Sequence, residues 1–269
     1  MPTLKLPSGG DLSWTENGTG PTAVLVHGSP ADRRAWGRVL EHLPGLRLVT
    51  PDLPGYGMSD PLPSAITDRS AAMGNAIALL IEHQDDPVLL AGHSYGANVA
   101  LHAAAQTAHN VRGLLLLEPV FFRALTLTDN NQAFDNGARF FQTYVTRVEA
   151  GDQSAISLMI DYWFGPGAFS KLPDPVRAYL QHGAPANAVD VRAAFSEVIE
   201  RSALDAIRAP TTIVHGGASP DITMSIANAL AALLPDAAAE ELAEGTHAML
   251  DADPAGVAAF VADLHQRTT

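Results

Sequence analysis

The 269-residue sequence contains no cysteine, which excludes disulfides, thiolate metal sites and a cysteine nucleophile. Basic residues are also scarce, since 16 Lys and Arg stand against 29 Asp and Glu, and the net charge is −13. Such a charge repels the phosphates of nucleic acids and the surface of anionic membranes. We therefore expect a small-molecule substrate as the partner, with no nucleic acid and no membrane. The oligomeric state stays open.

Long apolar runs are absent as well. The first ten residues, MPTLKLPSGG, hold no basic segment followed by an apolar stretch, so no signal peptide is visible. No run approaches the roughly 20 apolar residues that a membrane helix needs. These features predict a soluble, cytoplasmic protein.

The sequence contains several short apolar runs. They are typical of strands buried on both faces of a parallel sheet. The clearest are TAVLV (22–26), LRLVT (46–50), PVLLA (87–91), GLLLL (113–117) and TTIVH (211–215). A weaker candidate covers 238–242, and 4–14 reads as a hairpin that turns at Ser8-Gly9-Gly10-Asp11.

Helical spacings of apolar residues separate these runs. Asp253 and Pro254 are typical of a helix start, and we expect Thr223 to cap another helix. Strands that alternate with helices predict an α/β fold with a doubly wound, mostly parallel sheet. The apolar stripes are Trp36, Val39, Leu40, Leu43; Met73, Ile77, Leu80, Ile81; Ile226, Leu230, Leu233; and Val257, Phe260, Val261, Leu264.

Residues 119–209 break the alternation. They show no clear buried strand and hold most of the aromatic residues of the chain. A loop of this length without structure is implausible in a compact domain. We predict a helical insertion that lies over a core made of residues 1–118 and 210–269.

The stretch Gly92-His93-Ser94-Tyr95-Gly96 follows one predicted strand and precedes a predicted helix. A strand-to-helix turn this tight strains the serine backbone, and glycines two positions away remove the collisions that side chains would cause. The helix start also favours negative charge at that point. This context predicts that Ser94 is a nucleophile rather than an ordinary turn residue.

A serine nucleophile needs a base within hydrogen-bond reach. His247 is the candidate, because it follows the last predicted strand and precedes the last helix, on the sheet edge where Ser94 lies. We expect His27 to be structural, the side chain of His93 to point away from the site, and His215 to be a weaker rival.

Four motifs together resemble the α/β-hydrolase fold family: His27-Gly28-Ser29-Pro30, the segment from Asp52 to Ser59, the segment from Gly92 to Gly96, and Gly245-Thr246-His247. The match covers the chain except 119–209, where that family carries a variable cap. The resemblance implies a helical cap inserted after the sixth strand. It also implies an oxyanion hole formed by the backbone N–H groups of Ser29 and Tyr95.

The third member of the triad is where the sequence departs from the family, since Ser219 stands where an Asp is usual. Two carboxylates remain as candidates. Glu118 ends an apolar strand on the catalytic edge, where an unpaired buried charge would be costly, and Asp221 lies two residues beyond the usual position. We favour Glu118, with Asp221 as the alternative.

These residues predict a serine hydrolase that cleaves a small, apolar carboxylic ester through an acyl-enzyme, without metal or organic cofactor. Serine at position 94 disfavours the alkyl-enzyme route of relatives that use Asp there. C–C bond hydrolysis, lactonase, amidase or perhydrolase chemistry with the same triad stays an alternative. So does an acyltransferase, or a ligand receptor without catalysis on this fold.

Overall fold

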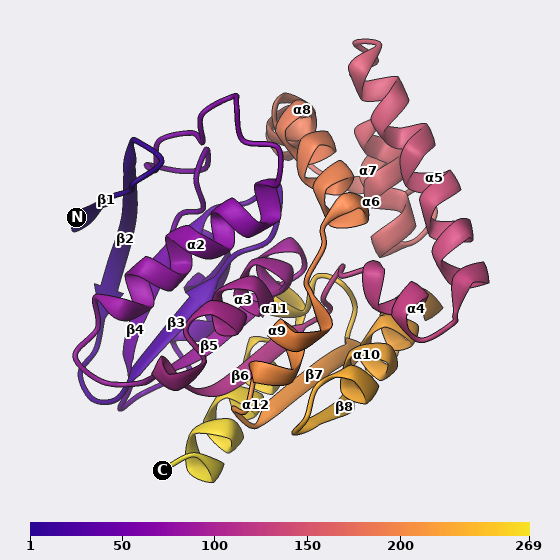
Figure 1. The fold of residues 1–269 in the computed structure, drawn as a ribbon. Coiled ribbons are helices and arrows are strands. Elements are labelled where there is room, and N and C mark those ends of the chain that lie inside the picture. Colours follow the sequence, from indigo (N-terminus) through magenta and orange to yellow (C-terminus); the bar gives the residue numbers. More distant parts are fainter.

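The computed structural model describes residues 1–269, and Figure 1 shows its arrangement around one central sheet. The sheet has eight strands in the order β1-β2-β4-β3-β5-β6-β7-β8. The strands are β1 (Thr3–Lys5), β2 (Asp11–Asn17), β3 (Thr22–Val26), β4 (Arg47–Pro51), β5 (Val88–His93), β6 (Val111–Leu117), β7 (Thr211–Gly216) and β8 (Ala237–Leu242).

The sheet is antiparallel at one end only. β1 and β2 form the predicted hairpin, and β2 pairs antiparallel with β4. All pairs from β4 to β8 are parallel. The prediction of a doubly wound, mostly parallel α/β sheet is confirmed. Because parallel strands end at one edge, the loops after β3, β5, β6, β7 and β8 can meet there.

Both faces of the sheet are covered, which explains the continuous apolar runs. Alternate side chains of one strand enter two separate cores: Val24 and Val26 pack on one side, Ala23 and Leu25 on the other. Helices α2 (Arg69–Glu82), α3 (Tyr95–Gln106) and α10 (Asp221–Leu233) cover the first face. The second face is covered by α1 (Gly37–Leu40), α11 (Met249–Ala252) and α12 (Pro254–Arg267).

The predicted start of α12 at Asp253 and Pro254 is confirmed, since the Asp253 side chain accepts a hydrogen bond from the Gly256 amide. The prediction for Thr223 is wrong. Helix α10 starts earlier, after Pro220, whose φ of −57° already suits a helix start, and the Thr223 hydroxyl donates to the Pro220 carbonyl instead.

The apolar residues from Trp36 to Leu43 do not lie on one continuous α-helix, although their spacing predicts one. The 3₁₀ helix η1 (Arg33–Trp36) leads into α1, which ends at Leu40. Leu43 stays buried but lies outside the helix, because the following Pro44 disfavours helical backbone in the residue before it. A second 3₁₀ helix, η2 (Ala108–Asn110), precedes β6.

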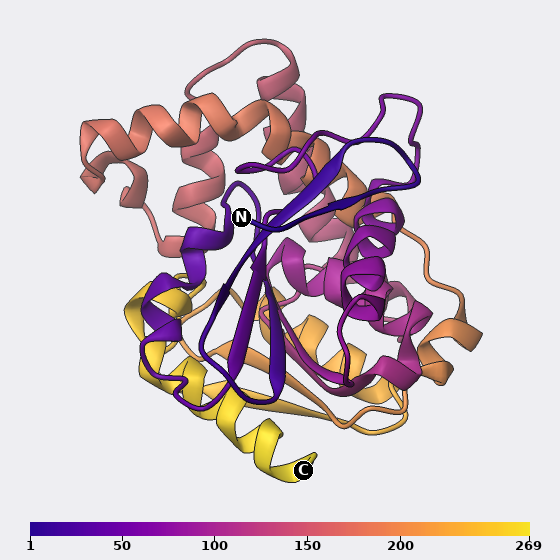
Figure 2. The same ribbon diagram turned by 90° about the vertical axis from the view of Figure 1, so that its left-hand side faces the viewer.

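The segment between β6 and β7, residues 119–209, contains helices and no strand. Figures 1 and 2 show most of these helices standing together beyond one end of the sheet. Its aromatic side chains pack on one another, as in the stacked rings of Phe122 and Phe195, 4.0 Å apart. Its division from the core as a separate cap stays a prediction. The helices are α4 (Arg123–Leu127), α5 (Asn131–Glu149), α6 (Ile156–Phe164), α7 (Ala168–Lys171), α8 (Asp174–Ser196) and α9 (Arg201–Ala206).

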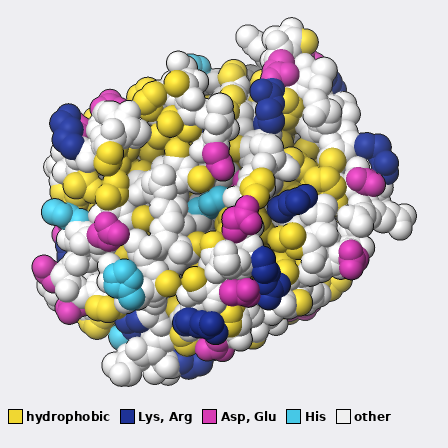
Figure 3. All heavy atoms as spheres, in the orientation of Figure 1, with side chains coloured by type: hydrophobic (Ala, Val, Ile, Leu, Met, Phe, Trp, Pro, Cys, Tyr) yellow, Lys and Arg dark blue, Asp and Glu magenta, His cyan; other side chains and the backbone are white.

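Charged side chains of both signs are interspersed with hydrophobic ones over the face drawn in Figure 3. None of the helices has the length and apolar composition needed to cross a membrane.

Candidate active site

Ser94 lies at the turn between β5 and α3. Its backbone is strained, with φ 55° and ψ −125°. A Cβ atom on Gly92 would collide with the Gly96 carbonyl, and one on Gly96 would collide with the His27 carbonyl. The two glycines therefore allow β5, α3 and β3 to approach closely while the serine side chain faces a cavity.

His247, in the loop between β8 and α11, lies between Ser94 and Glu118. Its Nε2 is 3.0 Å from Ser94 Oγ, and its Nδ1 is 2.5 Å from Glu118 Oε2. A carboxylate only accepts, so Nδ1 carries the proton and Nε2 is left to accept from the serine hydroxyl. All three side chains are at least nine-tenths buried.

Glu118 directly follows β6 and is fully buried. Its φ of +44° is unusual for a residue with a side chain. Its second oxygen, Oε1, accepts a 2.7 Å hydrogen bond from the Gly216 amide at the end of β7. Burial by itself would raise the pKa of Glu118, but the bonds from His247 and Gly216 hold that pKa below its ordinary value. Glu118 is thus an ionised partner of the imidazole at neutral pH.

Neither of the other two positions, Asp221 and Ser219, makes a hydrogen bond with the imidazole of His247, whose ring nitrogens contact Glu118 and Ser94. Asp221 is exposed at the start of α10 and makes no hydrogen bond with His247. Ser219 carries a neutral hydroxyl, which cannot balance the charge of a protonated imidazole. Only Glu118 brings a carboxylate to His247.

Two further aromatic rings lie against the imidazole of His247. Trp163 of α6 stacks on it, with ring centroids 4.2 Å apart and an angle of 16° between the planes. His93 approaches it as well, with centroids 5.0 Å apart. The stacked Trp163 ring restricts rotation of the imidazole out of its plane.

The expectation that His93 points away from the site is wrong. The His93 side chain lines the same cavity as Ser94, and its Nε2 lies 3.0 Å from the backbone carbonyl of His247. Burial, followed by the neighbouring His247, lowers the pKa of His93 to about 3. His93 is therefore neutral and ties the end of β5 to the His247 loop.

Ser29 lies in the loop after β3 and also lines the cavity, as does Tyr95. The backbone N–H of Ser29 donates to no acceptor within the protein. Tyr95 is the first residue of α3, so its amide has no partner within the helix. A Cβ on Gly28 would lie 3.0 Å from Ser94 Cβ, which shows how closely this loop approaches the serine.

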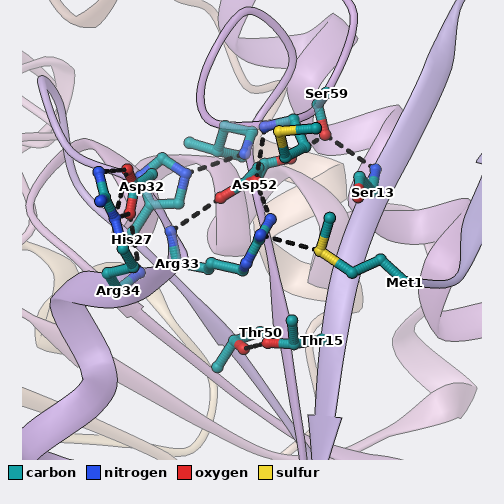
Figure 4. A network of polar contacts seen from close by, with 12 residues as sticks. Met1, Ser13, Thr15, His27, Asp32, Arg33, Arg34, Thr50, Asp52 and Ser59 are labelled. Atoms are coloured by element: carbon teal, nitrogen blue, oxygen red, sulfur yellow. Dashed lines mark hydrogen bonds and ion pairs between the residues drawn. The ribbon is translucent and has the colours of Figure 1, made fainter.

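The loop after β4 fixes the loop that carries Ser29 (Figure 4). Asp52 accepts hydrogen bonds from the Arg33 amide at 2.9 Å and the Met58 amide at 2.8 Å, and it pairs with the Arg33 guanidinium. His27 is structural, as expected: its Nε2 accepts from the Leu53 amide at 2.9 Å. The Asp52 motif thus braces the site without entering it.

The cavity in front of Ser94 has a volume of about 300 Å³ and an apolar wall. No Lys or Arg lines it, and its only carboxylates are Asp190 and Asp251. No cluster of three His, Asp or Glu side chains in the chain could hold a metal ion. Its apolar wall includes Val120, Phe122, Phe141, Met159, Ile160, Trp163, Phe164, Leu180, Val191, Ala194 and Leu250.

Sequence reasoning missed several residues at this cavity, among them Trp163, Asn187 and Asp190. All three come from the segment with no recognisable motif. The position of Trp163 directly before Phe164 in an aromatic-rich stretch was the only available signal. Nothing local distinguishes Asn187 or Asp190 from other polar residues of a long helix.

Comparisons with known proteins find relatives in sequence and in fold. The chain is 41% identical to lipase LipV of Mycobacterium tuberculosis over 103 residues, which cover 38% of each chain. It is 28% identical to the pimeloyl-[acyl-carrier protein] methyl ester esterase of Aromatoleum aromaticum over 265 residues, 91% of this chain and 98% of the other. It shares its fold with an esterase from Exiguobacterium antarcticum, with a TM-score of 0.75 at 18% identity and 98% coverage of both chains.

The first of these relatives is thus matched over less than two thirds of its length. A family model, in contrast, matches this chain from residue 23 to residue 260, which includes every residue from Ser29 to His247 described above. The chain belongs to the Alpha/beta hydrolase family.

Proposed function

We propose that the protein is a serine hydrolase that cleaves small, uncharged carboxylic esters. The observation that carries this proposal is the unbroken set of hydrogen bonds from Glu118 through His247 to Ser94 at the wall of an apolar cavity. The arrangement matches what an activated serine requires: a base that touches it and a carboxylate that orients the base.

In the first half of the reaction, Ser94 Oγ attacks the ester carbonyl carbon while His247 Nε2 takes the hydroxyl proton. Glu118 stabilises the imidazolium that forms. The amides of Ser29 and Tyr95 donate to the oxyanion. The tetrahedral intermediate collapses, the alcohol leaves with the proton from Nε2, and the acyl group stays on Ser94.

In the second half, water replaces the alcohol. His247 Nε2 takes a proton from the water as its oxygen attacks the acyl carbon, and the same two amides hold the oxyanion again. The proton then returns to Ser94 Oγ as the carboxylic acid leaves, so the enzyme is restored.

The cavity supports a small and uncharged substrate. A volume of about 300 Å³ stands at the lower end of the range for small-molecule sites. Because no cation lines it and two carboxylates do, it offers nothing to neutralise an anionic substrate. This favours an uncharged ester over any anionic substrate.

The direct test measures hydrolysis of p-nitrophenyl acetate, butyrate and octanoate by the wild type and by Ser94→Ala. We expect the wild type to hydrolyse the shorter esters faster than the octanoate, and Ser94→Ala to lose at least about 10³-fold in kcat. A fluorophosphonate should label the wild type at Ser94 and leave the variant unlabelled. A wild type that neither hydrolyses these esters nor reacts with the fluorophosphonate would contradict the proposal.

A further inference from the structure

A buried ion pair and a tyrosine connect helix α8 to the core beside the catalytic serine. Asp190 of α8 is 1% exposed and lines the cavity. Its Oδ1 accepts from Arg69 Nε of α2 at 2.5 Å, and its Oδ2 accepts from the Tyr56 hydroxyl. Tyr56 lies in the loop after β4. The Tyr56 hydroxyl is also 2.9 Å from Ser29 Oγ.

A second contact from the same helix reaches Ser29 directly. Asn187, one turn before Asp190, donates from Nδ2 to Ser29 Oγ at 3.1 Å. Its Oδ1 accepts from the Tyr144 hydroxyl of α5 at 2.8 Å. The hydroxyl of Ser29 is thus held by one residue of α8 and, through Tyr56, by another.

The donor and the acceptor of each hydrogen bond around the Ser29 hydroxyl can be assigned. The Asp190 carboxylate, paired with Arg69, only accepts, so Tyr56 must donate to it. The Tyr56 oxygen is then free to accept the proton of the Ser29 hydroxyl, whose oxygen in turn accepts from Asn187. Burial and the nearby charge of Asp190 raise the pKa of Tyr56 well above its ordinary value, so its proton stays in place. The hydroxyls of Ser29 and Tyr56 each donate to one acceptor, so these bonds have a single arrangement.

The other side of this loop is held by the core. His27 accepts from the Leu53 amide, and Asp52 accepts from the Arg33 amide, so the loop is anchored on both sides of Ser29. Between these two anchors, the bonds of the Ser29 hydroxyl to Asn187 and Tyr56 supply a third one, at Ser29 itself. The amide of Ser29 therefore depends for its orientation on contacts from the helical segment as well as on the sheet.

We propose that Asn187 and Asp190 of α8, acting through the Ser29 hydroxyl and Tyr56, are positioning residues that aim the Ser29 amide at the oxyanion. This inference rests on the proposed ester hydrolysis. It assigns the helical segment a part in stabilising the transition state, in addition to forming the wall of the cavity. An amide held in place in advance costs no reorganisation when the oxyanion forms.

The decisive variant is Ser29→Ala, which keeps the backbone amide and removes both hydrogen bonds of the side chain. Loss of a whole oxyanion donor costs about 10²–10³ in kcat, so a donor that is present but poorly aimed should cost about tenfold. We expect kcat to fall about tenfold with KM within about threefold of the wild type. Affinity for an alkyl boronic acid, which forms a tetrahedral adduct on Ser94, should fall by the same factor as kcat/KM.

Tyr56→Phe cuts the network at a second point and should give a similar fall in kcat. Its matched control is Tyr162→Phe, because Tyr162 of α6 makes no hydrogen bond through its hydroxyl and does not line the cavity. That variant should keep the wild-type kcat. In this proposal Asn187 acts through the Ser29 hydroxyl. Asn187→Ala alone should therefore lower kcat, whereas the double variant should have a kcat less than about twofold below that of Ser29→Ala.

The outcomes separate the two proposals. If the wild type hydrolyses the p-nitrophenyl esters but folded Ser29→Ala and Tyr56→Phe both keep kcat within about twofold, the positioning role is wrong and the hydrolase proposal stands. Independent, additive effects of Ser29→Ala and Asn187→Ala would likewise overturn it. If Ser29→Ala does not fold, Tyr56→Phe decides. A wild type without any hydrolysis would overturn the proposed function and this inference with it.

Discussion

The substitution Glu118→Gln tests the identity of the acid, because both oxygens of that carboxylate accept hydrogen bonds. One accepts from His247 Nδ1 and the other from the Gly216 amide. A glutamine has only one acceptor, so its NH₂ group must face one of these two donors. If it faces the Gly216 amide, two buried donors oppose each other at a cost of about 1–3 kcal/mol.

If the NH₂ group faces His247 instead, the imidazole can satisfy it by moving its proton to Nε2. His247 then cannot accept the proton of Ser94, and it has lost the negative charge that stabilises its protonated form. The equivalent amide substitution in serine proteases costs about 10⁴ in kcat. We expect Glu118→Gln to lower kcat by about 10³–10⁴, which is about 4–5.5 kcal/mol of transition-state stabilisation.

The assay is the steady-state hydrolysis of p-nitrophenyl butyrate, with thermal unfolding to show that the variant is folded. The matched control is Asp221→Asn, which makes the same change in charge at an exposed helix start and should stay within about twofold of wild-type kcat. A folded Glu118→Gln within tenfold of the wild type, or a large loss in Asp221→Asn, would refute the reasoning.

Three further predictions concern pH, the stacked tryptophan and the glycines of the turn at Ser94. The pKa of Glu118 is below its ordinary value of 4.5, so its stabilising contribution is present above that value and is lost as the pH falls through the folded-state pKa. The difference in melting temperature between the wild type and Glu118→Gln should therefore shrink as the pH is lowered below 4.5, and a difference that grows would contradict this. Trp163→Ala removes a ring stacked on His247, which becomes a cation during the reaction. Because cation–π contacts contribute about 0.5–2 kcal/mol, kcat should fall about 2- to 30-fold. Trp163→Phe keeps an aromatic ring and should retain most of the wild-type kcat. Gly96→Ala places a Cβ on backbone atoms and should abolish soluble folded protein or lower its melting temperature sharply; Gly37→Ala, in a helix with open space around the site, should raise stability slightly, by about 0.5–1 kcal/mol.

Local sequence was enough to predict the fold and the tight turn that carries Ser94. Apolar runs such as TAVLV must be buried on both sides, and the helical stripes between them leave few topologies other than a doubly wound sheet. The steric requirement around Ser94 is also local, because it acts between residues two positions apart. The helix boundaries were less secure near prolines, both at Leu43, which directly precedes Pro44, and at Thr223, which lies three residues after Pro220.

The sequence by itself therefore determined which strands form, where Ser94 stands and that His247 shares its edge of the sheet. It ranked Glu118 above Asp221 on the cost of an unpaired buried charge, but the contact with His247 spans 129 positions and exists only once β6 and β8 lie in one sheet. The tertiary structure alone placed Trp163, Asn187 and Asp190 at the cavity. Their roles depend on distances across elements far apart in the chain, and no local spacing encodes those distances.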